Sequence, residues 1–315
     1  MAGDRRALSE QIAESARNRM TLTALQKSGL RYAFFGIFLF SASLPLTKLA
    51  LQGYDPLFTA FARPLIAGTL AIPLMVRAGA LRLPRALWRP MIYVTIGGAF
   101  SWPIFIALAL QRSTSAHVAV IAAVMPLVTA IMSVIKTERK VGTQFWIASS
   151  LGTLLLILFA LSRGGAEGEN GVADLLTLAA VLGSSFCYVE GASLTKHMPG
   201  WQVISWVVII AIPISIVGAV LTYKHTEHLY QFHWNALLGL LGIGFSSMYL
   251  GFFAWYRGLK DLGVAHGSQV QQMQAIMTLG WSALFLHERI TLGTVSSACG
   301  IIICVLWAIT TANSV

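Results

Sequence analysis

The chain is dominated by ten apolar stretches, each long enough to cross a lipid bilayer. A helix needs about 20 mostly apolar residues to span a hydrocarbon core roughly 30 Å thick. The stretches cover residues 30–51, 56–76, 90–111, 114–135, 144–162, 172–195, 201–222, 234–256, 264–286 and 293–312. Backbone groups in lipid must find their hydrogen bonds within the protein. The pattern therefore predicts an all-α integral membrane protein with ten transmembrane helices.

The composition excludes most other classes of protein. Only 11% of the residues are charged and the mean hydropathy is +0.71, whereas soluble domains carry about 25% charged residues. The three cysteines lie in apolar runs without the spacing of a metal site or a disulfide framework. The connections between the stretches are too short for a soluble catalytic domain. We therefore expect no catalytic residues, no metal and no cofactor.

In a membrane protein, the net charge of +10 indicates which ends of the helices face the cytoplasm. With ten spans, most of the 22 Lys and Arg residues fall on the side of the amino terminus. Loops rich in Lys and Arg stay in the cytoplasm, so both termini are expected there. We expect the membrane to be a bacterial inner membrane. Since the positive charge is explained by orientation, no nucleic-acid partner is expected. Residues 1–28 are polar, lack the apolar core of a signal peptide and are expected to form a cytoplasmic tail. Charge alone does not separate this topology from a nine-span arrangement.

The sequence contains an internal duplication. Short motifs recur in the same order at an offset of about 145–150 residues, as duplicated units do. The clearest pairs are Gly97–Ser101 with Gly242–Ser246, Leu46–Lys48 with Leu194–Lys196, and Glu138–Arg139 with Glu288–Arg289. The halves, 29–163 and 171–313, hold five spans each, so the second must cross the membrane in the opposite sense. Two inverted five-helix repeats are a physical basis for alternating access.

Six motifs carry a family resemblance. They are Tyr256–Lys260, Gly263–Ser268 and Phe285–Ile290 in the second half, and Ala109–Ala116, Met125–Leu127 and Glu138–Arg139 in the first. With them the chain resembles the drug/metabolite transporter superfamily of the EamA-domain type, and within it the YddG-type amino-acid exporters. It departs from the family pattern at Thr137, where a glycine often precedes the glutamate.

The resemblance implies a secondary transporter that exports amino acids, either aromatic or over a broad range, or similar small metabolites. An exporter of drugs or other metabolites in the same superfamily is the alternative. A membrane-embedded enzyme or a channel is a more distant alternative function, because the sequence shows neither clustered catalytic acids nor a repeated pore segment. The partners expected are a small-molecule substrate and the lipid bilayer. Since one chain holds both halves, it is expected to work as a monomer.

Polar side chains inside the spans are the first candidates for a substrate site, because such groups are costly in lipid and face protein or water. Arg63 can pair with a substrate carboxylate, or form a structural ion pair. Glu190 can bind an amine or carry a proton, or pair with a neighbouring lysine. Gln269 and Gln272 can line a cavity, or join helices by hydrogen bonds.

Helix breaks and embedded aromatic residues supply the other candidates. Pro45 and Pro103 interrupt the first and third spans and are predicted to be hinges, since each removes a backbone hydrogen bond. Ser43, beside Pro45, is predicted to contact substrate through the interrupted helix. The rings of Trp102, Tyr188 and Tyr249 are predicted to wall the site, with ordinary packing as the alternative.

Overall fold

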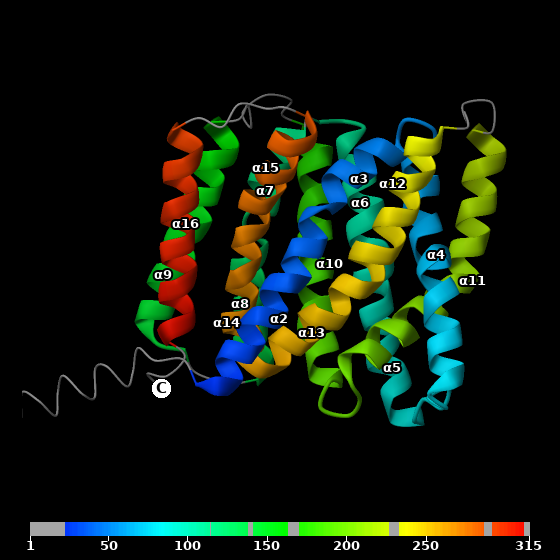
Figure 1. Cartoon of the computed structure of the whole chain (residues 1–315), viewed down its shortest axis with the longest axis horizontal. Coiled ribbons are helices and arrows are strands. Elements are labelled where there is room, and N and C mark those ends of the chain that lie inside the picture. The colour runs from blue at the N-terminus through cyan, green and yellow to red at the C-terminus, as the bar shows by residue number, and fades with distance from the viewer. Residues whose placement is uncertain are drawn as a thin grey trace, which may run out of the picture.

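A computed structural model describes residues 23–113, 115–137, 141–162, 170–226, 233–286 and 292–311. These residues form a bundle of upright helices (Figure 1). Eight of the helical segments are long and apolar enough to cross a membrane, and Ala298–Thr310 is a shorter apolar segment. The chain is thus an all-α, multi-pass membrane protein.

The first half makes five spans. They are α2 (Ala24–Ser41) with α3 (Ser43–Ala50); α4 (Pro56–Arg77); α5 (Arg85–Thr95) with the π-helical η1 (Ile96–Ser101) and α6 (Trp102–Leu110); α7 (Ser115–Ala122) with α8 (Met125–Thr137); and α9 (Thr143–Ala160).

The second half makes the other five. They are α10 (Gly171–Leu194); α11 (Gly200–Thr226); α12 (Trp234–Phe245) with the π-helical η4 (Ser246–Leu250) and α13 (Gly251–Leu262); α14 (Val264–Gln269) with the 3-10 turn η5 (Val270–Gln272) and α15 (Met273–Leu286); and α16 (Leu292–Thr310). We number the ten spans in this order.

The helices extend beyond several of the predicted apolar limits. Span 1 begins at Ala24 rather than at residue 30, because Thr23 and Gln26 form a capping box (Gln26 N to Thr23 Oγ1, 3.2 Å; Thr23 N to Gln26 Oε1, 2.8 Å). The expected tail therefore contributes its last residues to a helix, and residues 1–22 lie outside the described part of the chain. Span 3 likewise begins at Arg85, directly after Pro84.

The two halves are inverted with respect to each other. In Figure 1, α2 rises from the lower face of the bundle, whereas α10, which opens the second half, descends from the upper face. The start of α2 and the end of α16 lie on the same face. An even number of crossings follows for the described residues, which favours ten spans over nine.

The packing of the spans has the symmetry that a duplication requires. Span 8 packs along span 1, and the equivalent pair, spans 3 and 6, also packs together. Spans 2 and 7, 4 and 9, and 5 and 10 pair with their own counterparts. Exchanging the two halves therefore leaves this set of neighbours unchanged. Every span therefore packs against a span of the other half, and the contact between the halves runs through the whole bundle.

The helix irregularities follow the same repeat. The third span of each half contains a π-helical segment, η1 or η4. The fourth span of each half is interrupted, at Ala123–Val124 in the first half and at η5 in the second. Such interruptions often mark functional positions. Span 1 is broken at Ala42 while its counterpart α10 is continuous, so the two halves are similar but not equivalent.

Glycines allow span 1 and span 8 to approach closely. A Cβ at Gly36 would lie 2.9 Å from the backbone nitrogen of Trp255 and 3.0 Å from the Gly251 carbonyl oxygen. A Cβ at Gly258 would lie 2.6 Å from the Ala33 nitrogen. Helices in lipid gain no hydrophobic free energy by associating, so they are held together by close van der Waals packing, which small residues at the crossing allow. This seam fixes span 8, and with it η4, against the first half.

Candidate substrate site

Arg63 lies in the middle of span 2 and points into the interface between the halves. Its Nη2 donates to Ser247 Oγ at 2.9 Å, and its Nε is buried without a hydrogen-bond partner among the described residues. The ion pairs formed within the described ranges leave the guanidinium without a carboxylate. A buried cation of this kind is ready to bind an anionic group.

Local sequence explains how Arg63 reaches this position. Asp55 caps α4 by accepting from the nitrogens of Leu57 (2.8 Å) and Phe58 (3.1 Å), so the helix begins at Pro56. Pro64 lies inside the helix directly after Arg63. Because proline has no N–H, the i−4 hydrogen bond is missing at this level of the helix. The arginine therefore stands beside a weakened turn.

Ser247 and Tyr188 bring the second half to Arg63. Ser247 belongs to η4, and its own hydroxyl donates to the Ile243 carbonyl at 3.1 Å. Tyr188 of α10 is buried and lies within electrostatic range of Arg63. The guanidinium of span 2 is thus hydrogen-bonded to span 8 and interacts electrostatically with Tyr188 of span 6, both in the other half.

Tyr188 also packs in a cluster of aromatic rings. We call this the aromatic cluster, and it consists of Phe40, Tyr188, Phe252 and Trp255. The Tyr188 ring lies 5.4 Å from that of Trp255 and 6.1 Å from that of Phe252, while Phe40 lies 5.0 Å from Phe252. The Trp255 indole Nε1 is buried and has no partner among the described residues. The aromatic cluster is thus an apolar wall with one indole N–H that lacks a partner within the described ranges.

Three glutamines form a second polar group, the amide cluster (Gln269, Gln271 and Gln272), at the break of span 9. All three are buried in the middle of the bundle. Gln269 Nε2 donates to the Pro126 carbonyl at 3.3 Å, and Gln272 Nε2 donates to Gln269 Oε1 at 2.7 Å. Pro126 is the second residue of α8, just after the break of span 4. The interruptions of spans 4 and 9 therefore face each other.

Span 6 connects the two polar regions. Ser185 of α10 accepts from Thr129 Oγ1 at 2.9 Å and lies 3.5 Å from the Met125 carbonyl oxygen, which places it beside the amide cluster. Tyr188 follows Ser185 by one helical turn, a rise of about 4.5 Å. Ser185 and Tyr188 thus lie on neighbouring turns of span 6, which packs against span 4 through Thr129.

The structure supplies a partner for the carbonyl that Pro45 frees. Proline cannot donate to the residue four positions earlier, which is Ser41. Thr278 Oγ1 of α15 donates to this carbonyl at 3.2 Å, and Trp281 Nε1 donates to Ser41 Oγ at 2.9 Å. Ser41 thus joins spans 1 and 9, and Ser43, the predicted substrate contact, begins α3 two residues later.

The other predicted residues have different neighbours. Pro103 is the second residue of α6, which follows η1 directly. Tyr249 shares a 2.7 Å hydrogen bond with Ser205 of α11, and its ring lies 4.7 Å from Phe253. Trp102 is half-buried against the main core. Glu190 forms an ion pair with Lys136 of α8, which is the neighbouring-lysine alternative considered above. Among the described residues, the printed polar partners of Tyr249 and Glu190 are thus Ser205 and Lys136 rather than Arg63.

Sequence reasoning missed several members of the site. Ser247, Trp255, Ser185 and the Pro126 carbonyl give no signal of their own, since single serines and backbone groups are common in membrane helices. The repeat did give one hint, because Ser247 directly follows the matched motif Gly242–Ser246.

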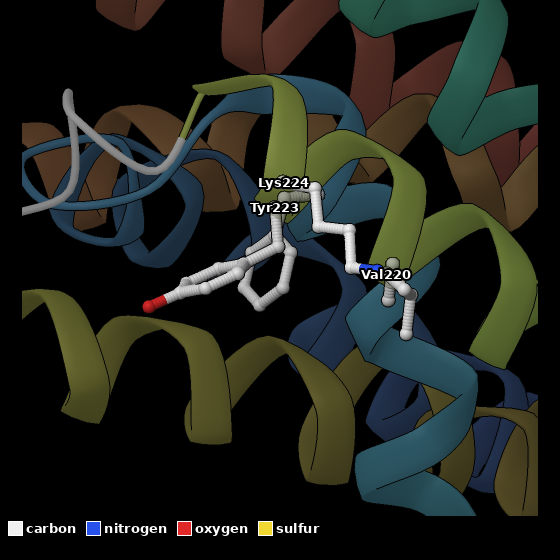
Figure 2. Close-up of a pocket in the computed structure, with 5 residues that line it drawn as sticks. Val220, Tyr223 and Lys224 are labelled. Atoms are coloured by element: carbon white, nitrogen blue, oxygen red, sulfur yellow. The ribbon is translucent and has the colours of Figure 1, made fainter.

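Two pockets open elsewhere, between α4 and α11. Figure 2 shows one of about 330 Å³ at the end of α11, where Tyr223 and Lys224 border an otherwise apolar wall. The other, of about 320 Å³, is lined by Leu65, Gly68, Thr69, Ile72, Pro73 and Ile212. Neither includes a residue predicted to bind substrate.

Comparison with known proteins identifies the family. The model of the EamA-like transporter family matches residues 27–161 and again 171–310, one match in each half. The chain belongs to the EamA-like transporter family. It is therefore a membrane transporter of small metabolites and not an enzyme.

Named relatives agree with this assignment. The uncharacterized transporter YdeK of Bacillus subtilis is 35% identical over 86% of this chain and 93% of its own length. An S-adenosylmethionine/S-adenosylhomocysteine transporter of Chlamydia trachomatis is 29% identical over 49% of each chain, so the match spans about half of that relative. One solved crystal structure, at 17% identity, has a TM-score of 0.72 over 90% of this chain and 96% of its own. That likeness concerns the fold alone.

Proposed function

We propose that this EamA-family transporter exports amino acids, or similar small metabolites that carry a carboxylate. The observation that carries the proposal is Arg63, a buried guanidinium without a carboxylate among the described residues. A charge inside a membrane protein is costly unless it is neutralised. A substrate carboxylate would neutralise it through bidentate hydrogen bonds, and the aromatic cluster offers an apolar surface for the side chain.

We propose alternating access as the mechanism. The halves, 29–163 and 171–313, would rock against each other around the interface that holds Arg63 and the amide cluster. Inverted repeats give inward-open and outward-open states of similar energy. Pro45 and Pro103 would be the hinges, because each lies at an interruption of its span.

The membrane and the orientation are part of the same proposal. The excess of Lys and Arg on the amino-terminal side favours cytoplasmic termini. The relatives come from bacteria, which supports a bacterial inner membrane. Because each chain contains both halves, the functional unit would be a monomer.

One relative favours a second candidate substrate. The chlamydial protein is named for S-adenosylmethionine and S-adenosylhomocysteine. Both compounds contain an amino-acid group and an adenine ring. Arg63 would bind the carboxylate of such a molecule, and the aromatic cluster would stack on the adenine ring.

Counterflow in liposomes tests the proposal. The full chain would be reconstituted and loaded with unlabelled amino acids, and entry of labelled phenylalanine would be followed with and without S-adenosylmethionine as competitor. We expect saturable exchange, with Arg63→Gln reducing kcat/KM at least tenfold. Arg89→Gln is the matched control, since Arg89 is exposed and bonded to Tyr93 on its own helix (2.9 Å). Lack of saturable exchange for any of the twenty amino acids and for S-adenosylmethionine would overturn the proposal.

A further inference from the structure

We infer that the groove between α4 and α11 binds one anionic phospholipid, with Lys224 paired to the headgroup phosphate and an acyl chain lying along the two helices. This site is separate from the proposed substrate site. Helical residues advance by about 100° each, so Arg63 lies about 140° around α4 from Phe58, which borders the groove. The inference therefore does not depend on which substrate the transporter carries.

The two pockets between α4 and α11 lie in line along this groove. The lining residues of both helices have the same spacing, seven and then four positions. Such positions fall on one face of a helix. They are Phe58, Leu65 and Thr69 on α4, and Ile212, Ala219 and Tyr223 on α11. Each helix therefore presents a single face to both pockets.

The groove faces the lipid and has the depth of one leaflet. Val220 is 46% exposed and Ile72 is 43% exposed, and α4 and α11 lie at one edge of the bundle (Figure 1). The rise along α4 from Phe58 to Ile72 is about 21 Å. One leaflet of a hydrocarbon core of roughly 30 Å is about 15 Å deep. An acyl chain can therefore lie along both pockets.

The walls of the groove are almost wholly apolar. The Thr69 hydroxyl donates to the Ile66 carbonyl at 2.7 Å, so its hydrogen is used within α4. The Tyr223 ring lies 5.9 Å from the Phe58 ring and lines the first pocket with it. The described residues that line the two pockets include no carboxylate. Such walls suit an acyl chain and offer nothing to a cationic headgroup.

Lys224 places a positive charge at one end of the groove. It lies two residues before the end of α11 at Thr226, on the face of the bundle opposite the start of α2 (Figure 1). No ion pair between described residues includes it. Figure 2 shows its side chain extending toward Val220, over the apolar wall of the first pocket.

A phospholipid matches both the charge and the apolar walls. A cation at the edge of the hydrocarbon region is stabilised by an anion, and lipid phosphates lie at this level of a membrane. A free phosphate would pair with Lys224 but leave the groove below it unfilled. Because no carboxylate lines the pockets, the site favours an anionic headgroup, as in phosphatidylglycerol, over one that also carries an ammonium group.

Native mass spectrometry of the full chain in detergent tests the inference. The protein would be titrated with phosphatidylglycerol and with phosphatidylcholine of the same acyl chains. We expect one phosphatidylglycerol to bind about fivefold more tightly, which is roughly what one lysine contributes to the binding of anionic lipid. Lys224→Gln should abolish this preference and Lys224→Arg should keep it. Val220→Trp keeps the charge but fills the first pocket, and it should weaken both lipids about fivefold or more.

Two variants are matched controls. Leu221→Trp adds the same ring at the next position, which lines neither pocket. Lys196→Gln removes an exposed lysine between α10 and α11. Neither should change the affinity for either lipid, and a loss in the controls equal to that in the groove variants would overturn the inference.

Three further results would also overturn it. The first is equal affinity of the native chain for the two lipids. The second is displacement of the lipid by inorganic phosphate together with no effect of Val220→Trp, because Lys224 would then bind phosphate alone. The third is a dimer that Val220→Trp dissociates, because a second copy of the chain would then occupy the groove.

Discussion

Lys136 of α8 forms an ion pair with Glu190 of α10, and the two residues belong to opposite halves of the transporter. At the other end of the same two spans, His117 Nε2 lies 2.8 Å from the Asp174 carboxylate. Thr129 and Ser185 are hydrogen-bonded between these pairs. Spans 4 and 6 are thus joined by polar contacts along their length, and each contact crosses the interface between the halves.

The first prediction concerns the Lys136–Glu190 pair. Glu190→Gln should lower the thermal unfolding midpoint by a few degrees, because the lysine then loses its partner; the effect is moderate, about 1 kcal/mol, since the pair is partly solvated. Reversing both charges, with Lys136→Glu and Glu190→Lys together, should restore the midpoint. Unfolding in detergent, followed by intrinsic fluorescence, measures both. Failure of the double variant to recover would show that the two residues act separately.

The second prediction concerns the Ser41 carbonyl. Thr278→Val removes the hydroxyl that donates to this carbonyl, and an unsatisfied buried carbonyl costs about 1–3 kcal/mol. Pro45→Ala would give the chain an N–H that can reach the same carbonyl. Thr278→Val should therefore destabilise the native protein more than it destabilises the Pro45→Ala variant. A double-mutant cycle of unfolding free energies measures the difference, and strict additivity would contradict the assignment.

The third prediction concerns the seam between spans 1 and 8. Gly36→Leu should destabilise the protein by about 2 kcal/mol or more, because its side chain would collide with the backbone of Trp255. Gly142→Ala is the control, since a Cβ there meets nothing within 4 Å. Its unfolding midpoint should stay close to that of the native protein. Equal effects at the two glycines would refute close packing at this seam.

The fourth prediction separates binding from positioning at Arg63. Ser247→Ala removes the hydroxyl that orients the guanidinium but leaves the charge. We expect the KM for the transported amino acid to rise about three- to tenfold, as for the loss of one hydrogen bond of about 1 kcal/mol. Arg63→Lys should raise this KM further, because an ammonium lacks the planar fork that binds a carboxylate. A larger loss in Ser247→Ala than in Arg63→Lys would assign the main contact to Ser247.

Part of the site is visible in the sequence because lipid penalises polar groups. Arg63, Gln269 and Gln272 stand out against apolar neighbours, and the structure places each of them at the interface of the halves. Their partners do not stand out. The Pro126 carbonyl is a backbone group, and Ser185 and Ser247 are ordinary serines until the second half is folded against the first. The sequence also left open whether Glu190 binds substrate or pairs with a lysine, because its ion pair with Lys136 joins residues of different spans.

Whereas the structure favoured ten spans over nine by placing the start of α2 and the end of α16 on one face, the sequence by itself predicted the apolar spans and the inverted duplication. These properties follow from local hydrophobicity, from helix length and from the odd number of crossings in each half, none of which needs a tertiary contact. Only the tertiary structure decided which polar group is satisfied and which is left free. The Ser41 carbonyl accepts from Thr278 and Glu190 pairs with Lys136, whereas Arg63 Nε and Gln272 Oε1 have no partner in the described part of the chain. Hydrogen bonding is directional and short-ranged, so this distinction exists only once helices far apart in the chain have packed together.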